Sequence, residues 1–236
     1  MFIFPGQGSQ SVGMSSCVLS TDIAKEMFNI TSSEMGYDLL DIIANGPEDL
    51  LRKTKNTQPA IFTTSVIMDK MLKDNNIYPI AVAGHSLGEY SALVSSEVIT
   101  FEDAVKLVNI RSIEMEKANN LNEGSMAAAI NISEDELKCI INELSGIITI
   151  ANYNSENQLV ISGEKTSIDA AIIQIKETHK KSKCIKLNVS GAFHSPLMEF
   201  ARASLENHIN ELTFNDAKIP IFQNIDGNPI KDSIKI

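Results

Sequence analysis

The sequence has few cysteines and no long apolar run. Cys17, Cys139 and Cys184 are widely spaced and form no C-x-x-C pair, which argues against a disulfide framework and against a zinc site. We expect them to be buried or inert thiols. No apolar run approaches the roughly 20 residues of a membrane-spanning helix. The segment Met1 to Phe4 has neither the basic residues nor the long apolar stretch of a signal peptide, so a cytoplasmic location is expected.

Basic residues are also scarce. Lysine and arginine together number 20 against 30 acidic residues, which gives a formal net charge of −10. This charge disfavours nucleic acid and anionic membranes as partners, because both would be repelled at long range. The densest basic run covers 179–183 and is followed by Lys186. Such a run is ordinarily a solvated helix end, and the alternative is a docking patch for an acidic partner.

The composition, with 43% hydrophobic and 21% charged residues, is that of an ordinary globular protein. At this length the chain can bury roughly 70 to 75% of its unfolded surface, enough for one sizeable core or two small ones. Strands are expected at 2–4 and 80–83. The first strand runs into a loop, 5–10, whose two glycines expose backbone N–H groups. A loop of this kind can hold an anion.

Helices alternate with these strands, which predicts an α/β fold. One is expected at 38–43, and another over 59–72, where Pro59 suits a first turn. A third follows Thr100, whose spacing from Asp103 is typical of a capping box. The broad apolar side of this third helix is formed by Val105, Val108, Ile113 and Met115.

The pattern changes to β-α-β-β-α-β between about 122 and 189, with Ser133 and Glu136 as a capping box for its first helix. The expected strands are 126–130, 147–151, 158–162 and 184–189, and the expected helices are 134–144 and 167–178. This order matches a ferredoxin-like subdomain. We therefore predict that 122–189 is a small subdomain inserted into a large α/β domain formed by 1–121 and 190–236.

Residues 84–88 read Gly-His-Ser-Leu-Gly and lie between the expected strand at 80–83 and a helical stretch. This context makes Ser86 the candidate nucleophile of a strand-to-helix elbow, where the glycines let neighbouring backbone approach and the hydroxyl projects outward. The helix N-terminus favours developing negative charge. The alternative is a Gly-rich turn with an incidental serine.

A serine nucleophile needs a base within hydrogen-bond reach. His85 is adjacent to Ser86, and its side chain is expected to point away. His179 and His208 lie in polar helical stretches, where a solvated surface histidine is the better interpretation. His194 differs, because it lies in a small-residue loop, 190–196, between a strand and a helix.

Four motifs follow one another along the chain: Phe-Pro-Gly-Gln-Gly-Ser-Gln at 4–10, Gly-His-Ser-Leu-Gly-Glu at 84–89, Arg111, and Gly-Ala-Phe-His-Ser at 191–195. Together they resemble the malonyl-CoA:acyl carrier protein transacylase family of acyltransferases. The resemblance covers almost the whole chain. It implies an α/β-hydrolase-like large domain that carries the inserted ferredoxin-like subdomain.

The resemblance also assigns roles by position. Ser86 would be the acylated nucleophile, and His194 the base that takes its proton and later returns it to the departing thiol. The backbone N–H groups of Gln7 and Leu87 would form the oxyanion hole. The alternative for residues 5–8 is a plain turn after the first strand.

Arg111 would hold the free carboxylate of malonate, since a guanidinium matches a carboxylate bidentately; the alternative is a helix-surface arginine paired with Glu114 or another acid. An acetyl group would leave this arginine buried and unpaired, at a penalty of roughly 3 to 5 kcal/mol. Phe193 resembles the Ala-Phe-His-Ser form that the family associates with malonyl groups, which makes it a candidate substrate-pocket residue. Alternatively, it fills core space beside His194.

The reaction implied by the resemblance has two steps. Malonyl-CoA acylates Ser86 and CoA leaves, and then the phosphopantetheine thiol of acyl carrier protein attacks the ester, with ping-pong kinetics. The partners are malonyl-CoA and acyl carrier protein, in fatty acid biosynthesis. No metal or cofactor of its own is expected, because the partner carries the phosphopantetheine, and a monomer is expected.

Two features depart from the family pattern. Ser112 and Glu116 stand where the family usually has Gly and Gln, and an extra acid near Arg111 could compete for it. Residues 223–230 resemble a segment that family members follow with further helices and a strand. The resemblance thus implies a truncated C-terminal end, either of a fragment or of a shortened protein.

Three other functions stay open. A stand-alone polyketide-synthase acyltransferase would share every motif. An acyl-thioester hydrolase would use the same Ser/His pair, although the lack of a clear acidic triad partner ahead of His194 disfavours a conventional esterase. A non-catalytic carrier-protein binder is disfavoured because Ser86, His194 and Arg111 are all present.

Overall fold

The computed structural model describes residues 1–189 and 191–236, a mixed α/β fold with two sheets. The chain divides into two compact units, Met1–Ile113 with Leu205–Ile236, and Glu114–Ser204. The divisions fall inside two helices, α6 (Phe101–Leu121) and α9 (Glu199–Asn210). The predicted α/β class is confirmed, and the predicted domain boundaries at 121/122 and 189/190 stay predictions.

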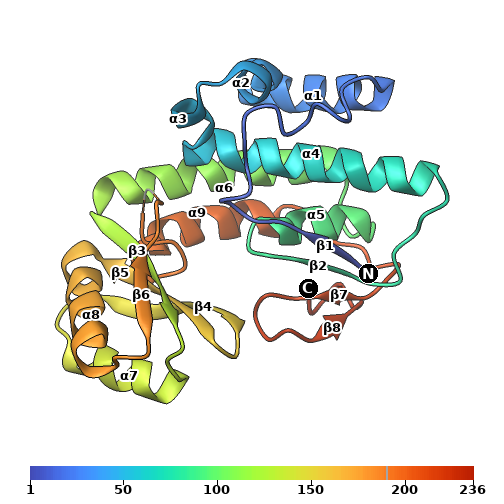
Figure 1. The fold of residues 1–236 in the computed structure, drawn as a ribbon. Coiled ribbons are helices and arrows are strands. Elements are labelled where there is room, and N and C mark those ends of the chain that lie inside the picture. The colour runs from blue at the N-terminus through green and yellow to red at the C-terminus, as the bar shows by residue number, and fades with distance from the viewer. Residues whose placement is uncertain (190) are drawn as a thin grey trace. The chain divides into compact units, whose positions relative to one another are not determined.

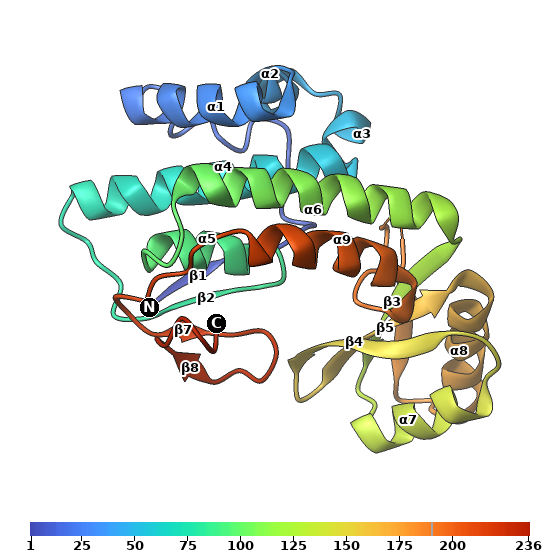
Figure 2. The ribbon, with the colours of Figure 1, turned by 180° about the vertical axis from the view of Figure 1, so that it is seen from behind.

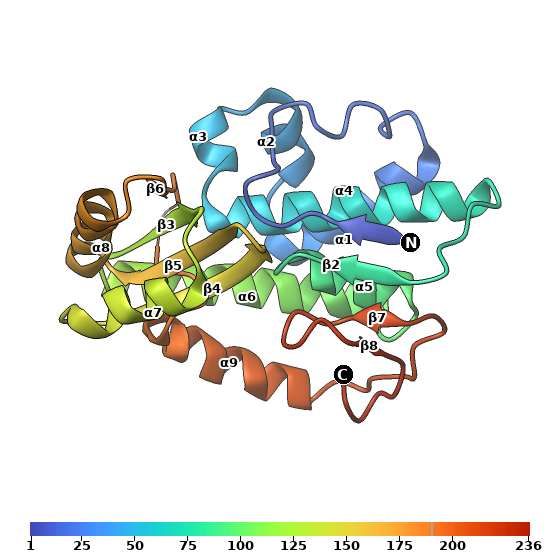
Figure 3. The ribbon, with the colours of Figure 1, turned by 60° about the horizontal axis from the view of Figure 1, so that its bottom comes forward.

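The sheet of the first unit has the strand order β1-β2-β7-β8. It consists of β1 (Phe2–Phe4), β2 (Val82–Gly84), β7 (Ile221–Phe222) and β8 (Pro229–Ile230). The first three strands are parallel, and β8 is antiparallel to β7 (Figure 3). Phe4 is paired with Gly84, so the loops that follow β1 and β2 leave the sheet at the same edge.

In Figures 1 and 2 the helices of the first unit lie above this sheet. They are α1 (Asp22–Met35), α2 (Leu39–Asn45), α3 (Glu48–Leu51), α4 (Thr54–Asp74), α5 (Gly88–Ser95) and the first part of α6. One apolar core joins them, and Phe28, Phe62, Leu39 and Ile67 in it are almost inaccessible to solvent. Helix α5 packs against β1 and β2 and so fixes the turn that precedes it.

The prediction that Pro59 begins its helix is wrong, because α4 begins five residues earlier, at Thr54. A proline inside a helix cannot donate to the carbonyl four residues before it, which here belongs to Lys55. The hydroxyl of Tyr37, between α1 and α2, has this carbonyl at 3.3 Å and Oδ1 of Asn56 at 2.6 Å as acceptors. Its one proton is shared between them, so a side chain outside α4 compensates in part for the missing donor.

The second unit contains the expected order β-α-β-β-α-β. Its elements are β3 (Gly124–Ile130), α7 (Glu134–Glu143), β4 (Ile148–Ser155), β5 (Gln158–Glu164), α8 (Lys165–Thr178) and β6 (Lys183–Lys186). The strand order is β4-β5-β3-β6, with antiparallel neighbours throughout. Strand β6 ends before the predicted position 189, and Ser190 lies outside the described residues.

Local signals in the second unit agree with the structure. Ser133 and Glu136 form the expected capping box at the start of α7. An apolar cluster of residues from β3, β5, α7 and α8 forms a core, with Leu137, Ile161, Ile168 and Ile175 fully buried. After β6, a short 3-10 helix, η1 (Pro196–Met198), leads into α9.

Ile113, predicted on the broad apolar side of α6, is 37% exposed, whereas Val105 and Val108 of the same side are buried. The cysteines were expected to be buried or inert thiols. Cys17 and Cys139 are free and exposed, so they are not buried and their inertness stays a prediction, whereas burial raises the pKa of Cys184 to about 11. Within the described residues, no helix is long and apolar enough to cross a membrane.

Candidate active site

Ser86 lies on a tight turn between β2 and α5. Its φ of 50° is in the left-handed region, which is uncommon for a residue with a side chain. The two glycines of the motif permit the turn, because a Cβ atom on Gly84 would lie 1.9 Å from the carbonyl carbon of Gly88 and one on Gly88 would lie 2.3 Å from the carbonyl oxygen of Phe4. This geometry is that of a nucleophile elbow.

The loop after β1 contacts the elbow directly. The N–H of His85 donates to the carbonyl of Phe4 at 3.0 Å. A Cβ atom on Gly6 would lie 2.5 Å from the carbonyl oxygen of His85 and 2.8 Å from its Nδ1 atom, so only glycine fits there without displacement. The hydroxyl of Ser9 donates to the carbonyl of Gly6 and closes the loop. The parallel pairing of the two strands thus brings two predicted motifs together.

Arg111 of α6 contacts Ser86, the candidate nucleophile. Its Nη2 atom donates to the Oγ atom of Ser86 at 3.0 Å, and its Nη1 atom donates to Oε1 of Gln58 at 2.7 Å. The side chain is 9% exposed and lies 5.6 Å from the ring centroid of Tyr90. Burial lowers the pKa of the guanidinium from its ordinary value, while Tyr90 and Glu89 act in the opposite direction.

The alternative pairing of Arg111 with Glu114 is not what the structure describes. The Glu114 carboxylate forms an ion pair with Lys117 at 2.7 Å. The guanidinium instead donates to two neutral oxygens, those of Ser86 and Gln58, so a substrate carboxylate would not have to displace a protein carboxylate from these atoms. An almost buried guanidinium next to the candidate nucleophile is suited to binding a carboxylate, because its N–H groups can donate to both oxygens.

Gln58 joins Arg111 to the glycine loop. This fully buried residue of α4 accepts from Arg111, and its Nε2 atom donates to Oε1 of Gln7 at 3.4 Å. The Nε2 atom of Gln7 in turn donates to the hydroxyl of Thr54 at 3.4 Å. The side chain of Gln7 is therefore tied to α4, and this fixes the backbone of the loop that carries its N–H group.

The predicted donors of the oxyanion hole are the backbone N–H groups of Leu87 and Gln7. Leu87 follows the nucleophile, and Gln7 lies in the loop against the elbow. Within residues 1–189 and 191–236, neither N–H donates to a protein acceptor. Leu87 itself is 1% exposed, and its side chain is part of the core.

A polar side chain from the C-terminal segment also meets the elbow. The N–H of Ser86 donates to Oδ1 of Asn224 at 2.9 Å, and Nδ2 of Asn224 donates to the carbonyl of Gly84 at 2.7 Å and to the carboxylate of Glu89. Burial raises the pKa of Glu89, while the hydrogen bonds from Asn224 and the charge of Arg111 act in the opposite direction.

His194 belongs to the second unit, so the structure describes its own loop and not its position relative to Ser86. Its φ is 58°, again in the left-handed region. The loop is closely packed: a Cβ atom on Gly191 would lie 1.6 Å from Oδ1 of Asn119, and one on Gly124 would lie 2.6 Å from the N atom of Ala192. Ser195 caps η1 by accepting from the N–H of Leu197.

Phe193 is 6% exposed and lies in an apolar cluster of the second unit. Its neighbours there are Met115, Ala118, Met126, Val160, Met198 and Ala201. This environment agrees with the simpler expectation that the ring fills core space beside His194. Any effect of Phe193 on the acyl group stays a prediction.

The sequence matches the family model described as acyl transferase domain over residues 1–233. The chain belongs to the acyl transferase domain family. A Staphylococcus aureus protein named malonyl CoA-acyl carrier protein transacylase is 39% identical over 239 residues, covering 99% of this chain and 77% of the relative. A Synechocystis protein of the same name is 36% identical over 235 residues, covering 100% of this chain and 77% of the relative.

Solved structures agree with this acyltransferase assignment. The malonyl CoA-acyl carrier protein transacylase of Coxiella burnetii has a TM-score of 0.93 and 36% identity, over 99% of this chain and 75% of that one. A malonyl-transacylase in complex with a type II PKS acyl-carrier protein also has a TM-score of 0.93, with 33% identity, over 99% of this chain and 77% of that one.

Some members of this acyltransferase site escaped the sequence reasoning. No local pattern in the sequence marks Gln58 as functional. The helix was predicted to begin at Pro59, so Gln58 was placed just before it, in a polar stretch. Asn224 lies in a stretch noted only for its resemblance, 138 residues from Ser86. Glu89 was noted only as part of the motif at 84–89, and Tyr90 was given no role. Tertiary contacts join Glu89 to Asn224 and Tyr90 to Arg111.

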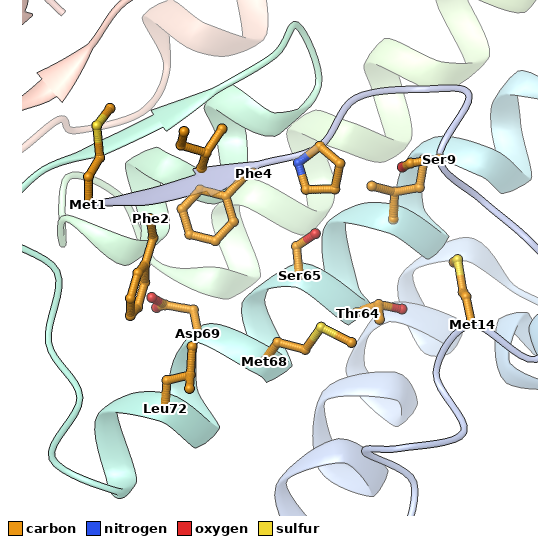
Figure 4. A pocket seen from close by; sticks show the side chains of 13 residues that line it. Met1, Phe2, Phe4, Ser9, Met14, Thr64, Ser65, Met68, Asp69 and Leu72 are labelled. Carbon is orange, nitrogen blue, oxygen red and sulfur yellow. The ribbon is translucent and has the colours of Figure 1, made fainter.

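A cavity that is not lined by the elbow residues 84–88 is also present in the described part of the chain. It has a volume of about 410 Å³ and lies between β1 and α4 (Figure 4). Its wall is largely apolar and includes Phe2, Phe4, Met14, Met68 and Leu72, with Asp69 at one side. Ser86 and Arg111 do not line it, so the acyltransferase chemistry is not assigned to this cavity.

Proposed function

We propose that the protein transfers a malonyl group from malonyl-CoA to the phosphopantetheine thiol of acyl carrier protein, through an ester on Ser86, in fatty acid biosynthesis. The observation that carries this proposal is the 3.0 Å hydrogen bond from the Arg111 guanidinium to the Ser86 hydroxyl. A cation at this distance from the attacking atom is suited to an acyl group that ends in a carboxylate. The names of the relatives support the same reaction.

In the first half-reaction, Oγ of Ser86 attacks the thioester carbonyl and His194 accepts the hydroxyl proton. The tetrahedral intermediate then expels CoA, whose sulfur takes the proton from His194. In the second half-reaction, His194 accepts the proton of the carrier-protein thiol, the thiolate attacks the seryl ester, and the proton returns to Ser86 as the ester bond breaks. His194 is proposed as the base from its loop position and the family motif.

The developing oxyanion would be held by the N–H groups of Leu87 and Gln7. Removing one such donor typically costs about 3 to 4 kcal/mol of barrier. The tie from Gln7 through Gln58 to Arg111 supports this role, because the donor that meets the carbonyl and the cation that meets the carboxylate are then held in one frame. A malonyl group has these two functions close together.

Several broader features belong to this proposal. We propose an α/β-hydrolase-like large domain, 1–121 with 190–236, that carries a ferredoxin-like subdomain, 122–189, with Phe193 at the acyl pocket. A cytoplasmic monomer without its own cofactor or metal is part of the same proposal.

The test is a transfer assay with purified protein. Labelled malonyl-CoA is incubated with the wild type and with Ser86→Ala, with and without holo acyl carrier protein, and free acid, protein-bound label and carrier-bound label are separated. We expect label on the wild type, passage to the carrier, and none on Ser86→Ala. Rapid release of free acid without a carrier would indicate a hydrolase, and a carrier complex without labelled ester would indicate a binder.

The acceptor is the part of the proposal with a specific second candidate. One structural neighbour is a malonyl-transacylase in complex with a type II PKS acyl-carrier protein. The same assay with a polyketide carrier in place of the fatty acid carrier compares the two acceptors. A preference for the polyketide carrier would move this protein to polyketide assembly without changing the roles of Ser86 and Arg111.

A further inference from the structure

We propose that Asn224 is a positioning residue for the nucleophile and that it acts together with Glu89. The inference rests on the proposed function, because it concerns the same serine. Asn224 does not touch the reacting hydroxyl in any described contact. It holds the backbone of Gly84 and Ser86, on the N-terminal side of the nucleophile, and so sets the direction of Oγ.

The contacts of Asn224 span the turn. Its Oδ1 atom accepts from the N–H of Ser86 at 2.9 Å, and its Nδ2 atom donates to the carbonyl of Gly84 at 2.7 Å. One side-chain amide therefore bonds to a backbone N–H group and a backbone carbonyl group that lie two residues apart. Both groups can reach the same amide only because the chain bends at this turn. This arrangement stabilises the left-handed conformation of Ser86, whose φ is 50°.

Glu89 fixes the orientation of the amide. Its carboxylate accepts from both the side chain and the backbone N–H of Asn224, the latter at 3.4 Å. An ionised carboxylate can only accept, so in this state Glu89 requires the NH₂ group of Asn224 on its side and leaves Oδ1 for the N–H of Ser86. Glu89 lies in the first turn of α5, where negative charge is favoured by the helix N-terminus.

The polar contacts of Asn224 are exposed to solvent in part, since the residue itself is exposed. Water can therefore replace them when the side chain is removed, so the loss of stability should be small. Water cannot hold the two peptide groups in one geometry, and small displacements of a nucleophile can cost a hundredfold in rate. The expected signature is a loss of acylation rate without a matching loss of stability.

The experiment compares Asn224→Ala with Asn228→Ala, a control on the same segment whose side chain bonds to Asp226. Single-turnover acylation by malonyl-CoA gives the rate constant and the dissociation constant separately, and a fluorophosphonate gives the reactivity of Ser86 without malonate. For Asn224→Ala we expect the acylation rate to fall about 10- to 100-fold, with binding of malonyl-CoA and the melting temperature nearly unchanged. Asn228→Ala should behave as the wild type.

A charge exchange gives a second test. Asn224→Asp keeps the acceptor for Ser86 but places a carboxylate against Glu89 and the carbonyl of Gly84, so it should be slow. In Asn224→Asp with Glu89→Gln, the new amide donates to the new carboxylate, and we expect the acylation rate to recover in part. A merely structural role predicts rates that follow melting temperature in all variants.

The outcomes separate the two proposals. If the wild type reacts with the fluorophosphonate but not with malonyl-CoA, the proposed function fails, and the fluorophosphonate rates of the variants still test Asn224. The inference is overturned if Asn224→Ala reacts as fast as the wild type with both reagents. It is also overturned if the variants lose rate only in proportion to melting temperature, or if the double variant is no faster than Asn224→Asp.

Discussion

The turn at Ser86 and the loop at His194 both hold a side chain in the left-handed backbone region, with φ of 50° and 58°. This conformation costs roughly 1 to 2 kcal/mol per residue. At Ser86 the cost is offset largely by polar contacts, with Asn224 bonded to the N–H of Ser86 and to the carbonyl of Gly84. At His194 it is offset by packing, with Phe193 buried and Gly191 pressed against Asn119.

The difference bears on what mutations should do. A turn that is held by solvent-exposed hydrogen bonds can lose one of them and stay folded, so a substitution there changes the reaction rate. A loop held by apolar packing transmits a substitution to the core of its unit. Variants near Ser86 should therefore change rates, and variants beside His194 should change stability as well.

The largest effect on rate is expected from His194→Ala. Removing a general base typically costs 10²- to 10⁴-fold, about the size expected for acylation of Ser86 here. The side chain of His194 is exposed and contributes little to packing, so the melting temperature should change little. His208→Ala is the control. Acylation of His194→Ala at the wild-type rate would exclude this histidine as the base.

Phe193→Ala is expected to be the largest change in stability beside the loop. Truncating a buried phenylalanine typically costs about 3 to 5 kcal/mol, measured by urea unfolding. Phe200→Ala is the matched control, since Phe200 is 53% exposed and a surface change is usually within about 0.5 kcal/mol. Equal stabilities for the two variants would contradict the packed loop.

Arg111→Ala tests the Ser86 turn through its choice of acyl group. We expect kcat/KM for malonyl-CoA to fall by about a hundredfold or more relative to acetyl-CoA, because the bound carboxylate loses its cation. Arg202→Ala is the control, because Arg202 pairs with Glu199 at 2.6 Å on an exposed face. An unchanged ratio of malonyl to acetyl transfer would show that Arg111 does not select the acyl group.

The smallest effect is expected from Ser133→Ala, at the start of α7. Loss of the capping box should lower stability by about 1 kcal/mol, seen as a lower melting temperature, and leave transfer unchanged. The variant tests whether the second unit responds to a purely local change. A strong loss of transfer at full stability would mean that α7 has a part in the reaction.

The sequence predicted what local patterns encode. The elbow, the capping box at Ser133 and the β-α-β-β-α-β order follow from glycine spacing, caps and apolar runs over short windows. Gln58 and Asn224 could not be found in this way, because their partners lie 53 and 138 residues away. The predicted start of α4 was too late for the same reason. The hydroxyl of Tyr37, far from Pro59 in the sequence, contacts the Lys55 carbonyl to which Pro59 cannot donate.

The most direct test of the central claim is peptide mapping by mass spectrometry after the protein is mixed with malonyl-CoA and no acceptor. We predict a malonyl ester on the peptide that contains Ser86, lost when holo acyl carrier protein is added. An unmodified Ser86, or a malonyl group on another residue that passes to the carrier, would contradict the account.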